Sequence, residues 1–573
     1  MQQPTQLLFI LLLTIFAACQ STPKGEIADV IYHNGMVITM EGVNQKATSV
    51  AIKNGKILAV SENSLVATHQ GDATKVIDLN GKTMLPGFVD AHSHLAMMMP
   101  LMAQANISSP PVSTIKNIKD IVQKLKTYQE KNSVAKGEWI VGWGYNPDLL
   151  DEKRHPNKLD LDEAFPNNPV FLMHASGHMA VVNSVTLAKV GIDETTKNPA
   201  GGMIVRFPNS SEPTGLVQET ALYAIRKTLP TPTPKEAMVL LESVQNLYAS
   251  HGITTAQEGF ADYKTYQLLA KAAEAGKLKL DIEVLAGFLN MKEYFTNHLA
   301  EFGQRKNRLR LAGVKIVSDG SPQGKTAFFS KPYLTEVPGC AHDCKGFPNL
   351  TKAQLGGLMK QCYQAGVQLY THANGDGAID LFLETHQSVI DSMATVPKDL
   401  RSVIIHSQFV RPDQLELYKQ YEMVPAYFTN HAFFWGDTHL ANLGEARASF
   451  LSPMKTTMDM GITCTNHTDF AVTPIDQLFL LWTAVNRTTR SGKILGPAER
   501  LTPYEGLKAI TINSAYQHKQ EHLKGSIKVG KLADLVILAE NPLTIAADKI
   551  KDMTVLETIK EGETIYRRGE AAK

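Results

Sequence analysis

The chain has 573 residues, several times the length of a typical single domain, so we expect at least two domains. Its 57 basic and 56 acidic residues leave a net charge of +1. This balance gives no overall electrostatic attraction to nucleic acid or to an anionic membrane. Hydrophobic residues make up 43% of the sequence and charged residues 20%, a globular composition that excludes disordered and fibrous classes.

The N-terminus differs from the rest of the chain. An apolar run over 7–18 is too short to span a bilayer, which takes about 20 residues, and suits a secretory signal peptide. The run ends in FAAC, which resembles a bacterial lipobox and implies lipidation of Cys19. We therefore predict a signal peptide over 1–18, a linker over 19–26 and export as a periplasm-facing lipoprotein, with Gln20 resembling outer-membrane sorting. A buried N-terminal helix is the alternative.

Both ends of the remaining chain have the pattern of short strands and turns. Asn-Gly pairs separate alternating apolar residues in the segment 27–83, which is the pattern of β-hairpins. The segment 520–573 has a similar pattern. The simplest prediction is one composite β-sandwich domain built from these two segments.

Between them, strand-like and helix-like patterns alternate, which predicts an α/β fold with a parallel sheet. Eight apolar runs stand out, at 84–92, 253–258, 280–286, 312–319, 367–373, 402–408, 423–429 and 462–469. Eight such units favour a (β/α)8 TIM-like barrel, here over 84–519. The first two runs lie about 160 residues apart, too far for an ordinary connection, so we expect an insertion over about 100–250.

Ionisable side chains gather at the carboxyl ends of these runs, the face that carries active sites in such barrels. His92 and His94 end the first run, and residues i and i+2 of a strand point the same way, so both imidazoles can chelate one ion. Further candidates lie in the fourth, fifth, sixth and eighth runs: Lys315, His372, His406 and Asp469. A lone histidine here would more often be a packed core residue, whereas the whole set favours a metal site.

This set resembles the amidohydrolase superfamily and, within it, the YtcJ-like or amidohydrolase-3 family, which includes N-substituted formamide deformylases. Matching stretches occur in the same order over roughly 27–570, among them LPGFVDAHSH (85–94), GWGYNP (142–147), LMHASGHMAVVNS (172–184), GITTAQE (252–258), VKIVSDGSPQGKTA (314–327), HANGDGAID (372–380) and GSIKVGKLADLVIL (525–538). The resemblance implies a metal-dependent hydrolase that cleaves a non-peptide C–N bond of a small-molecule amide with metal-activated hydroxide.

The resemblance also implies a role for each candidate. His92 and His94 would bind the more buried ion, and His372 and His406 the second. Asp469 would bind metal and transfer protons as the catalytic residue. Two Zn ions are expected, with Mn, Fe or Ni as alternatives, and Lys315 would be carboxylated by CO2 and bridge them.

Lys315 leaves alternatives open. It could instead pair with Asp319 or extend along the surface, in which case Glu219 or Glu258 could supply the carboxylate, or the centre could hold one ion. His467, two residues before Asp469, could orient that carboxylate, touch substrate or pack as a barrel histidine.

Substrate residues are predicted from two places. His178 lies in the family-like stretch 172–184 of the insertion and either contacts substrate or is an ordinary loop histidine. The segment 427–437 concentrates aromatic side chains with His431 and Trp435, which is typical of sites that bury apolar ligands, although these residues could equally pack the insertion on the barrel.

Other interpretations stay open at this stage. The same centre could hydrolyse a cyclic amide or an ester, or the chain could be a non-catalytic regulatory or binding lipoprotein. We expect a small-molecule amide substrate, no nucleic-acid partner and membrane contact only through the lipid anchor; a homodimer is left open. Cys340 and Cys344 favour a disulfide over a metal-binding pair, because no second pair accompanies them.

Overall fold

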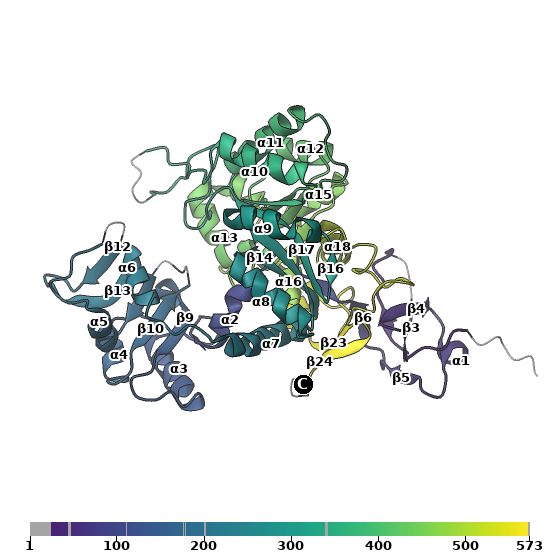
Figure 1. Cartoon of the computed structure of the whole chain (residues 1–573), viewed down its shortest axis with the longest axis horizontal. Helices are drawn as coiled ribbons and strands as arrows, with labels where there is room; N and C mark the ends of the chain where they lie inside the picture. The colour runs from purple at the N-terminus through teal and green to yellow at the C-terminus, as the bar shows by residue number, and fades with distance from the viewer. Residues whose placement is uncertain are drawn as a thin grey trace, which may run out of the picture.

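The computed structural model describes residues 25–43, 47–110, 112–175, 177, 179–199, 202–337 and 342–570. Its centre is a curled sheet of eight parallel strands, to which the short strand β16 (Arg305–Lys306) is added in antiparallel orientation, and three smaller sheets lie around it (Figure 1). The eight strands are β7 Phe88–Val89, β14 Ile253–Ala261, β15 Asp281–Gly287, β17 Leu309–Val317, β18 Leu369–Ala373, β19 Val403–His406, β20 Val424–Tyr427 and β21 Thr465–Asn466. Each of the eight predicted runs overlaps one of them, and the expectation of a TIM-like α/β fold is confirmed.

The parallel strands are buried along almost their whole length, as expected for a sheet covered on both faces. Helices follow most of them: α8 Tyr263–Glu274, α9 Met291–His298, α10 Lys352–Gln364, α11 Asp376–Asp391, α12 Pro412–Gln420, α13 Asn430–Leu443 and α16 Gln477–Asn486. The helix starts are encoded locally. The Asp262 side chain caps α8, and Thr351 and Gln354 form a capping box on α10.

The first and last strands meet through side chains. No ladder joins β7 to β21 among the described residues. Instead, the amide of Gln517, at the end of α18 (Ile512–Gln517), donates to Ala91 O at 2.7 Å and accepts from Thr465 Oγ1 at 2.6 Å. One glutamine thus spans the seam between β7 and β21, the two ends of the sheet.

The segment between β7 and β14 forms its own six-stranded sheet, in the order β12-β13-β11-β10-β9-β8. Its strands are β8 Ala105–Asn106, β9 Ile140–Tyr145, β10 Val170–His174, β11 Met179–Val182, β12 Gly202–Arg206 and β13 Pro213–Glu219. Alternate residues of β10 pack in two different cores: Leu172 against α3 (Ile118–Lys131), and Phe171 against α5 (Ser184–Val190). Helix α7 (Pro234–Ser250), which directly precedes β14, packs in the barrel core again.

The two chain ends build two further sheets. One, in the order β4-β3-β1-β5, comes from the N-terminus; the other, β2-β6-β22-β23-β24, combines both ends. The strands are β1 Val30–His33, β2 Met36–Val37, β3 Ser49–Lys53, β4 Lys56–Ser61, β5 Lys75–Asp78, β6 Thr83–Pro86, β22 Leu535–Leu538, β23 Val555–Lys560 and β24 Glu563–Arg567. They share one core, in which Tyr32 and Val50 meet Leu535 and Ile559.

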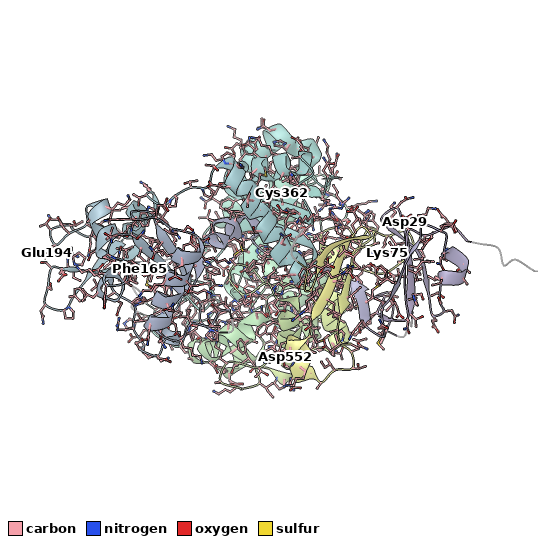
Figure 2. The ribbon with its side chains drawn as sticks, turned by 90° about the horizontal axis from the view of Figure 1, so that it is seen from below. Asp29, Lys75, Phe165, Glu194, Cys362 and Asp552 are labelled. Atoms are coloured by element: carbon pink, nitrogen blue, oxygen red, sulfur yellow. The ribbon has the colours of Figure 1, made fainter. Side chains whose placement is uncertain are left out.

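A view turned by 90° shows the barrel between these parts, with Glu194 of the insertion and Asp29 of the N-terminal sheet towards opposite ends (Figure 2). Among the described residues, no helix has both the length and the apolar character needed to cross a membrane.

Candidate metal centre

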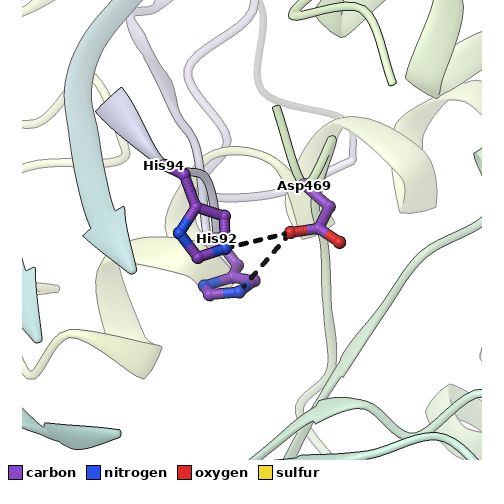
Figure 3. A group of neighbouring side chains, drawn as sticks. All are labelled: His92, His94 and Asp469. Carbon is purple, nitrogen blue, oxygen red and sulfur yellow. Dashed lines mark ion pairs between the residues drawn. The ribbon is translucent and has the colours of Figure 1, made fainter. Parts of the chain in front are cut away.

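The predicted histidine pair and the aspartate that follows β21 converge at the carboxyl ends of the barrel strands. Asp469 Oδ1 lies 3.6 Å from His92 Nε2 and 3.5 Å from His94 Nε2 (Figure 3). One ligand atom from each residue lies within 4.8 Å of the others, so a single cation can contact all three. The approach joins residues that are 377 positions apart in the sequence, because β21 returns beside β7.

Backbone hydrogen bonds fix this approach. Asp469 N donates to His92 O at 3.1 Å, and His94 N donates to Phe470 O at 2.5 Å. Asp469 has a positive φ of 49°, a left-handed conformation that is uncommon outside glycine and that aspartate tolerates better than most residues. The turn after β21 is therefore held against the turn after β7, and both side chains are presented on one side.

The tautomer of His92 is set by its neighbour Gln257. The Gln257 amide donates through Nε2 to Ala91 O at 3.0 Å, so its Oε1 is the atom that faces His92 Nδ1, at 2.5 Å. His92 must then carry its hydrogen on Nδ1. The lone pair on Nε2 is left for a cation, as is usual for metal-binding histidines supported by an acceptor.

Lys315 lies beside this lone pair. Its side chain leaves the interior of β17, is only 2% exposed, and places Nζ 2.9 Å from His92 Nε2. Burial lowers the pKa of Lys315 to about 7, against a smaller opposing effect of Asp469. The amine is therefore readily neutral near physiological pH, which is the form that reacts with CO2. The pairing of Lys315 with Asp319 is not what the structure shows: Asp319 contacts His372 and accepts backbone N–H groups instead.

His406 and His372 form the other half of the cluster. His406 Nε2 lies 4.0 Å from Asp469 Oδ2, and the His406 ring is centred 5.8 Å from that of His92. The His372 ring is centred 4.5 Å from that of His406. The structure thus brings His372 into the cluster through His406, whereas Asp469 contacts the other three histidines directly.

The electrostatics of the cluster favour the protonation states that metal binding requires. Burial holds the pKa of His92 and of His406 well below the usual value, so both imidazoles are neutral. Burial would raise the pKa of Asp469, but the contact with His94 and the electrostatic influence of the neighbouring imidazoles of His406 and His92 outweigh it and hold that pKa well below the ordinary value. Neutral imidazoles and an ionised carboxylate are ligands for Zn and similar divalent cations.

Buried polar atoms at the mouth lack protein partners. Asp469 Oδ1, His406 Nδ1 and both ring nitrogens of His467 have no well-aligned hydrogen bond among the described residues. Such atoms are rare in folded proteins, because each costs roughly 1–3 kcal/mol when left unsatisfied. The donor set and these atoms fit a divalent cation.

The remaining predicted residues lie further out or outside the described part of the chain. His431, at the start of α13, packs edge-to-face on Phe428 with ring centres 4.5 Å apart, and Phe428 packs on His467 at 4.9 Å. Trp435 packs on His431 at 4.5 Å. These rings therefore form a chain leading away from the cluster. His178, Cys19 and Cys340 lie outside the described residues, so their predicted roles stay predictions.

His467 occupies the centre of the cluster. It is fully buried, and its ring is centred 5.3 Å from His92 and 5.1 Å from His406. Glu258, considered above as an alternative ligand, accepts instead from the backbone N–H of Ala96 at 2.7 Å, in the first turn of α2 (Leu95–Met102). Nothing is described of the Glu219 side chain.

Sequence reasoning missed the supporting residues. Gln257 lies inside the stretch 252–258 that had been matched to the family, but its contact with His92 spans 165 positions. Gln517 lies in a helix without any such motif and reaches Ala91 over 426 positions. Only folding reveals such partners, although a glutamine within a buried strand was a usable signal for Gln257.

Comparison with known proteins places the chain. The sequence pattern of the amidohydrolase family matches residues 75–566. The chain belongs to the amidohydrolase family. It is 27% identical to the N-substituted formamide deformylase of Arthrobacter pascens, over 95% of this chain and 99% of that one. It is 30% identical to the protein LONG AFTER FAR-RED 3 of Arabidopsis thaliana, over 95% and 92%.

A solved structure supports the same placement. An uncharacterized metal-dependent hydrolase from Pyrococcus furiosus superposes with a TM-score of 0.70 at 25% identity, over 90% of this chain and 100% of that one. The amidohydrolase-family prediction made from the sequence is thus confirmed.

Proposed function

We propose that this amidohydrolase-family member hydrolyses a non-peptide C–N bond of amide or formamide type and that it depends on divalent metal. One observation carries the proposal: His92, His94 and Asp469 present ligand atoms within 4.8 Å of one another, beside Lys315 and His406. The N-substituted formamide deformylase named above supports the choice of bond.

A bound divalent cation would lower the pKa of water to about 7 and polarise a carbonyl group. The chain's own residues do the rest. The Asp469 carboxylate, with Oδ1 toward His92 and His94 and Oδ2 toward His406, is placed to accept a proton and to return it to the leaving nitrogen. Protonation of that nitrogen is the step that most needs an acid, because an amide anion is a poor leaving group.

The proposal extends from one bound cation to two. His92 and His94 would hold one, His406 and His372 the other, and carboxylated Lys315 would bridge them. The neutral, buried amine of Lys315 beside His92 supports carboxylation. Incubating the protein with 13C-labelled bicarbonate and Zn should give a carbamate carbon signal that is lost in K315A; no signal in the wild type would reject it.

The substrate is proposed to carry an apolar or aromatic group. Phe428, His431 and Trp435 form the ring series that starts at His467, and such linings are typical of sites for apolar ligands. His178 is proposed to contact substrate from the insertion. Comparable turnover of small polar amides and aromatic ones would reject this preference.

The central test combines metal analysis with a substrate panel. Purified protein should contain Zn, Mn, Fe or Ni, lose activity in chelator and regain it on reconstitution. The panel should include N-substituted formamides, N-acyl amines, cyclic amides and esters. Preference for cyclic amides or esters would replace the proposed bond. Metal-free protein with no turnover after reconstitution would favour a non-catalytic regulatory or binding role.

Export is a separate proposal. The FAAC sequence supports lipidation of Cys19 and attachment to the periplasmic side of a bacterial membrane. C19S should then move from the membrane fraction to the soluble fraction, and unchanged fractionation would contradict lipidation. The oligomeric state is left open, and light scattering would show whether the protein forms a homodimer.

A further inference from the structure

Helix α2 begins directly at the predicted ligand His94. The backbone of His94 is the N-cap of α2, but its side chain makes no capping hydrogen bond. Its Nε2 lies instead beside Asp469 Oδ1, at 3.5 Å. Most helices have a Ser, Thr, Asp or Asn side chain at the N-cap, because the first N–H groups of a helix have no partner within the helix. A metal ligand at this position therefore leaves the start of α2 without its usual support.

Glu258 supplies this support from another strand. It lies in β14 and is only 3% exposed, and its Oε2 accepts from the N–H of Ala96, the second residue of α2, at 2.7 Å. The contact spans 162 positions of the sequence. The other oxygen, Oε1, accepts from Phe260 N at 3.3 Å. Both oxygens are thus used by backbone N–H groups, and one of these groups is the donor that an N-cap side chain would ordinarily satisfy.

Backbone contacts join the two segments at the same place. Gly259 N donates to Ser93 O at 2.8 Å, and His94 and Glu258 form an isolated antiparallel bridge. The hydroxyl of Tyr248 donates to Ser93 Oγ at 3.0 Å. The turn that carries His94 is therefore held against the end of β14, and the Glu258 side chain extends this contact to the first turn of α2.

We propose that Glu258 is a positioning residue for His94: it caps α2 in place of the histidine, which leaves the imidazole free to bind a cation. The hydrogen bonds favour this role over that of a ligand, because both carboxylate oxygens already accept from backbone N–H groups. The inference rests on the proposed function, because His94 needs to be positioned only if it binds a metal.

The test compares E258Q with E499Q. Glu499 is a matched control because it is also a buried glutamate, 5% exposed, that caps a helix from a distant segment: its Oε2 accepts from Thr456 N in the first turn of α15 (Met454–Asp459) at 3.0 Å. Among the described residues it contacts none of the predicted ligands. A glutamine has only one side-chain oxygen, so each variant loses an acceptor while the shape of the side chain is kept. Zn affinity is measured by chelator competition, and the unfolding temperature is measured on the metal-free proteins.

We expect E258Q to weaken the binding of Zn by about 10-fold or more, because partners that orient a ligand typically contribute 10- to 100-fold to metal affinity. E499Q should stay within about threefold of wild type, because sites without shared partners act independently. Both variants should lower the unfolding temperature, since each removes a helix cap. Equal losses of Zn affinity in the two variants would overturn the inference and indicate a general effect of lost stability. Wild type that binds no Zn would reject the proposed function instead.

A double variant distinguishes positioning from direct ligation. If Glu258 acts through His94, adding E258Q to H94A should cause no further loss of Zn affinity, measured with a weaker chelator. A further loss would mean that Glu258 binds the metal itself, which contradicts the positioning role. Should E258Q fail to fold, hydrogen exchange of the metal-free wild type must show a protected amide at Ala96, because a first-turn amide is slow to exchange only when it has an acceptor. Rapid exchange at Ala96 would remove the proposed cap.

Discussion

Lysine is buried at both ends of the barrel, but its partners differ. They are carboxylates at the base and a neutral imidazole at the mouth. At the base, Lys560 Nζ lies 2.9 Å from Asp281 and 2.8 Å from Asp534, and Lys524 also contacts Asp281. At the mouth, Lys315 Nζ contacts the neutral ring of His92. The charges at the base are neutralised by partners, whereas the mouth leaves buried donors and acceptors unpaired.

This difference separates structure from function. The base network joins the first residue of β15 to the sheet that combines both chain ends, so its paired charges link two parts of the fold. A fully paired network is costly to break but does no chemistry. Unpaired buried groups at the mouth cost free energy of folding, which the stability of the rest of the fold offsets. These groups are the ones that can bind a ligand. The predictions below test this contrast.

The largest effect is expected for Asp469. D469N retains an oxygen for metal binding but cannot take up a proton, so kcat should fall by about 10²- to 10⁴-fold or more while most metal is retained. Kinetics and metal analysis of the same preparation measure both. Near-normal turnover would remove the proton-transfer role.

The next effect is at the base. Burial opposes the charged form of Lys560, but Asp281 and Asp534 outweigh it and raise its pKa. Its stabilising contribution is therefore fully present below pH about 10.5 and is lost only as the pH rises through the folded-state pKa. K560M should lower the free energy of unfolding at pH 7 by about 3–5 kcal/mol, measured with urea. The exposed control K549M should change it by no more than about 0.5 kcal/mol.

At the mouth, replacing the buried lysine is expected to change stability in the opposite direction. Because the pKa of Lys315 is lowered to about 7, the unfolded chain binds more protons than the folded one between pH about 7 and about 10.5. The stability of the metal-free protein should therefore rise with pH in this range through Lys315. K315M should remove this contribution and stabilise the metal-free protein at pH 7–8 by about 1–3 kcal/mol. Destabilisation as large as that of K560M would contradict the contrast.

The smallest effect is steric. A Cβ at Gly259 would lie 2.8 Å from Ser93 O and 2.9 Å from His92 Nδ1, so the His92 ring would have to move. G259A should cost about 1–3 kcal/mol of stability and weaken metal binding. Gly357, in α10 with open space around it, is the control: G357A should be neutral or stabilising by up to about 1 kcal/mol. Unchanged metal affinity in G259A would mean that the ring can move freely.

Local sequence patterns were sufficient to predict much of the fold and of the candidate site. The eight parallel strands lie in short, mostly apolar segments, and His92, His94, His372, His406 and Asp469 lie at or just after their ends, so strand positions and candidate ligands could both be predicted. The partners of those ligands could not. Gln257 and Asp319 contact His92 and His372 only after separate strands have come together, and an isolated glutamine or aspartate carries no mark of its partner.

The sequence by itself determined which residue types stand at the ends of parallel strands, because side-chain alternation and strand polarity follow from local backbone geometry. Tertiary structure decided which nitrogen of each imidazole carries hydrogen, which buried lysine is charged and which polar atoms stay unpaired. These properties depend on atoms a few ångströms away that belong to distant parts of the chain, and the cost of burying them is set by the assembled surroundings rather than by neighbours in the sequence.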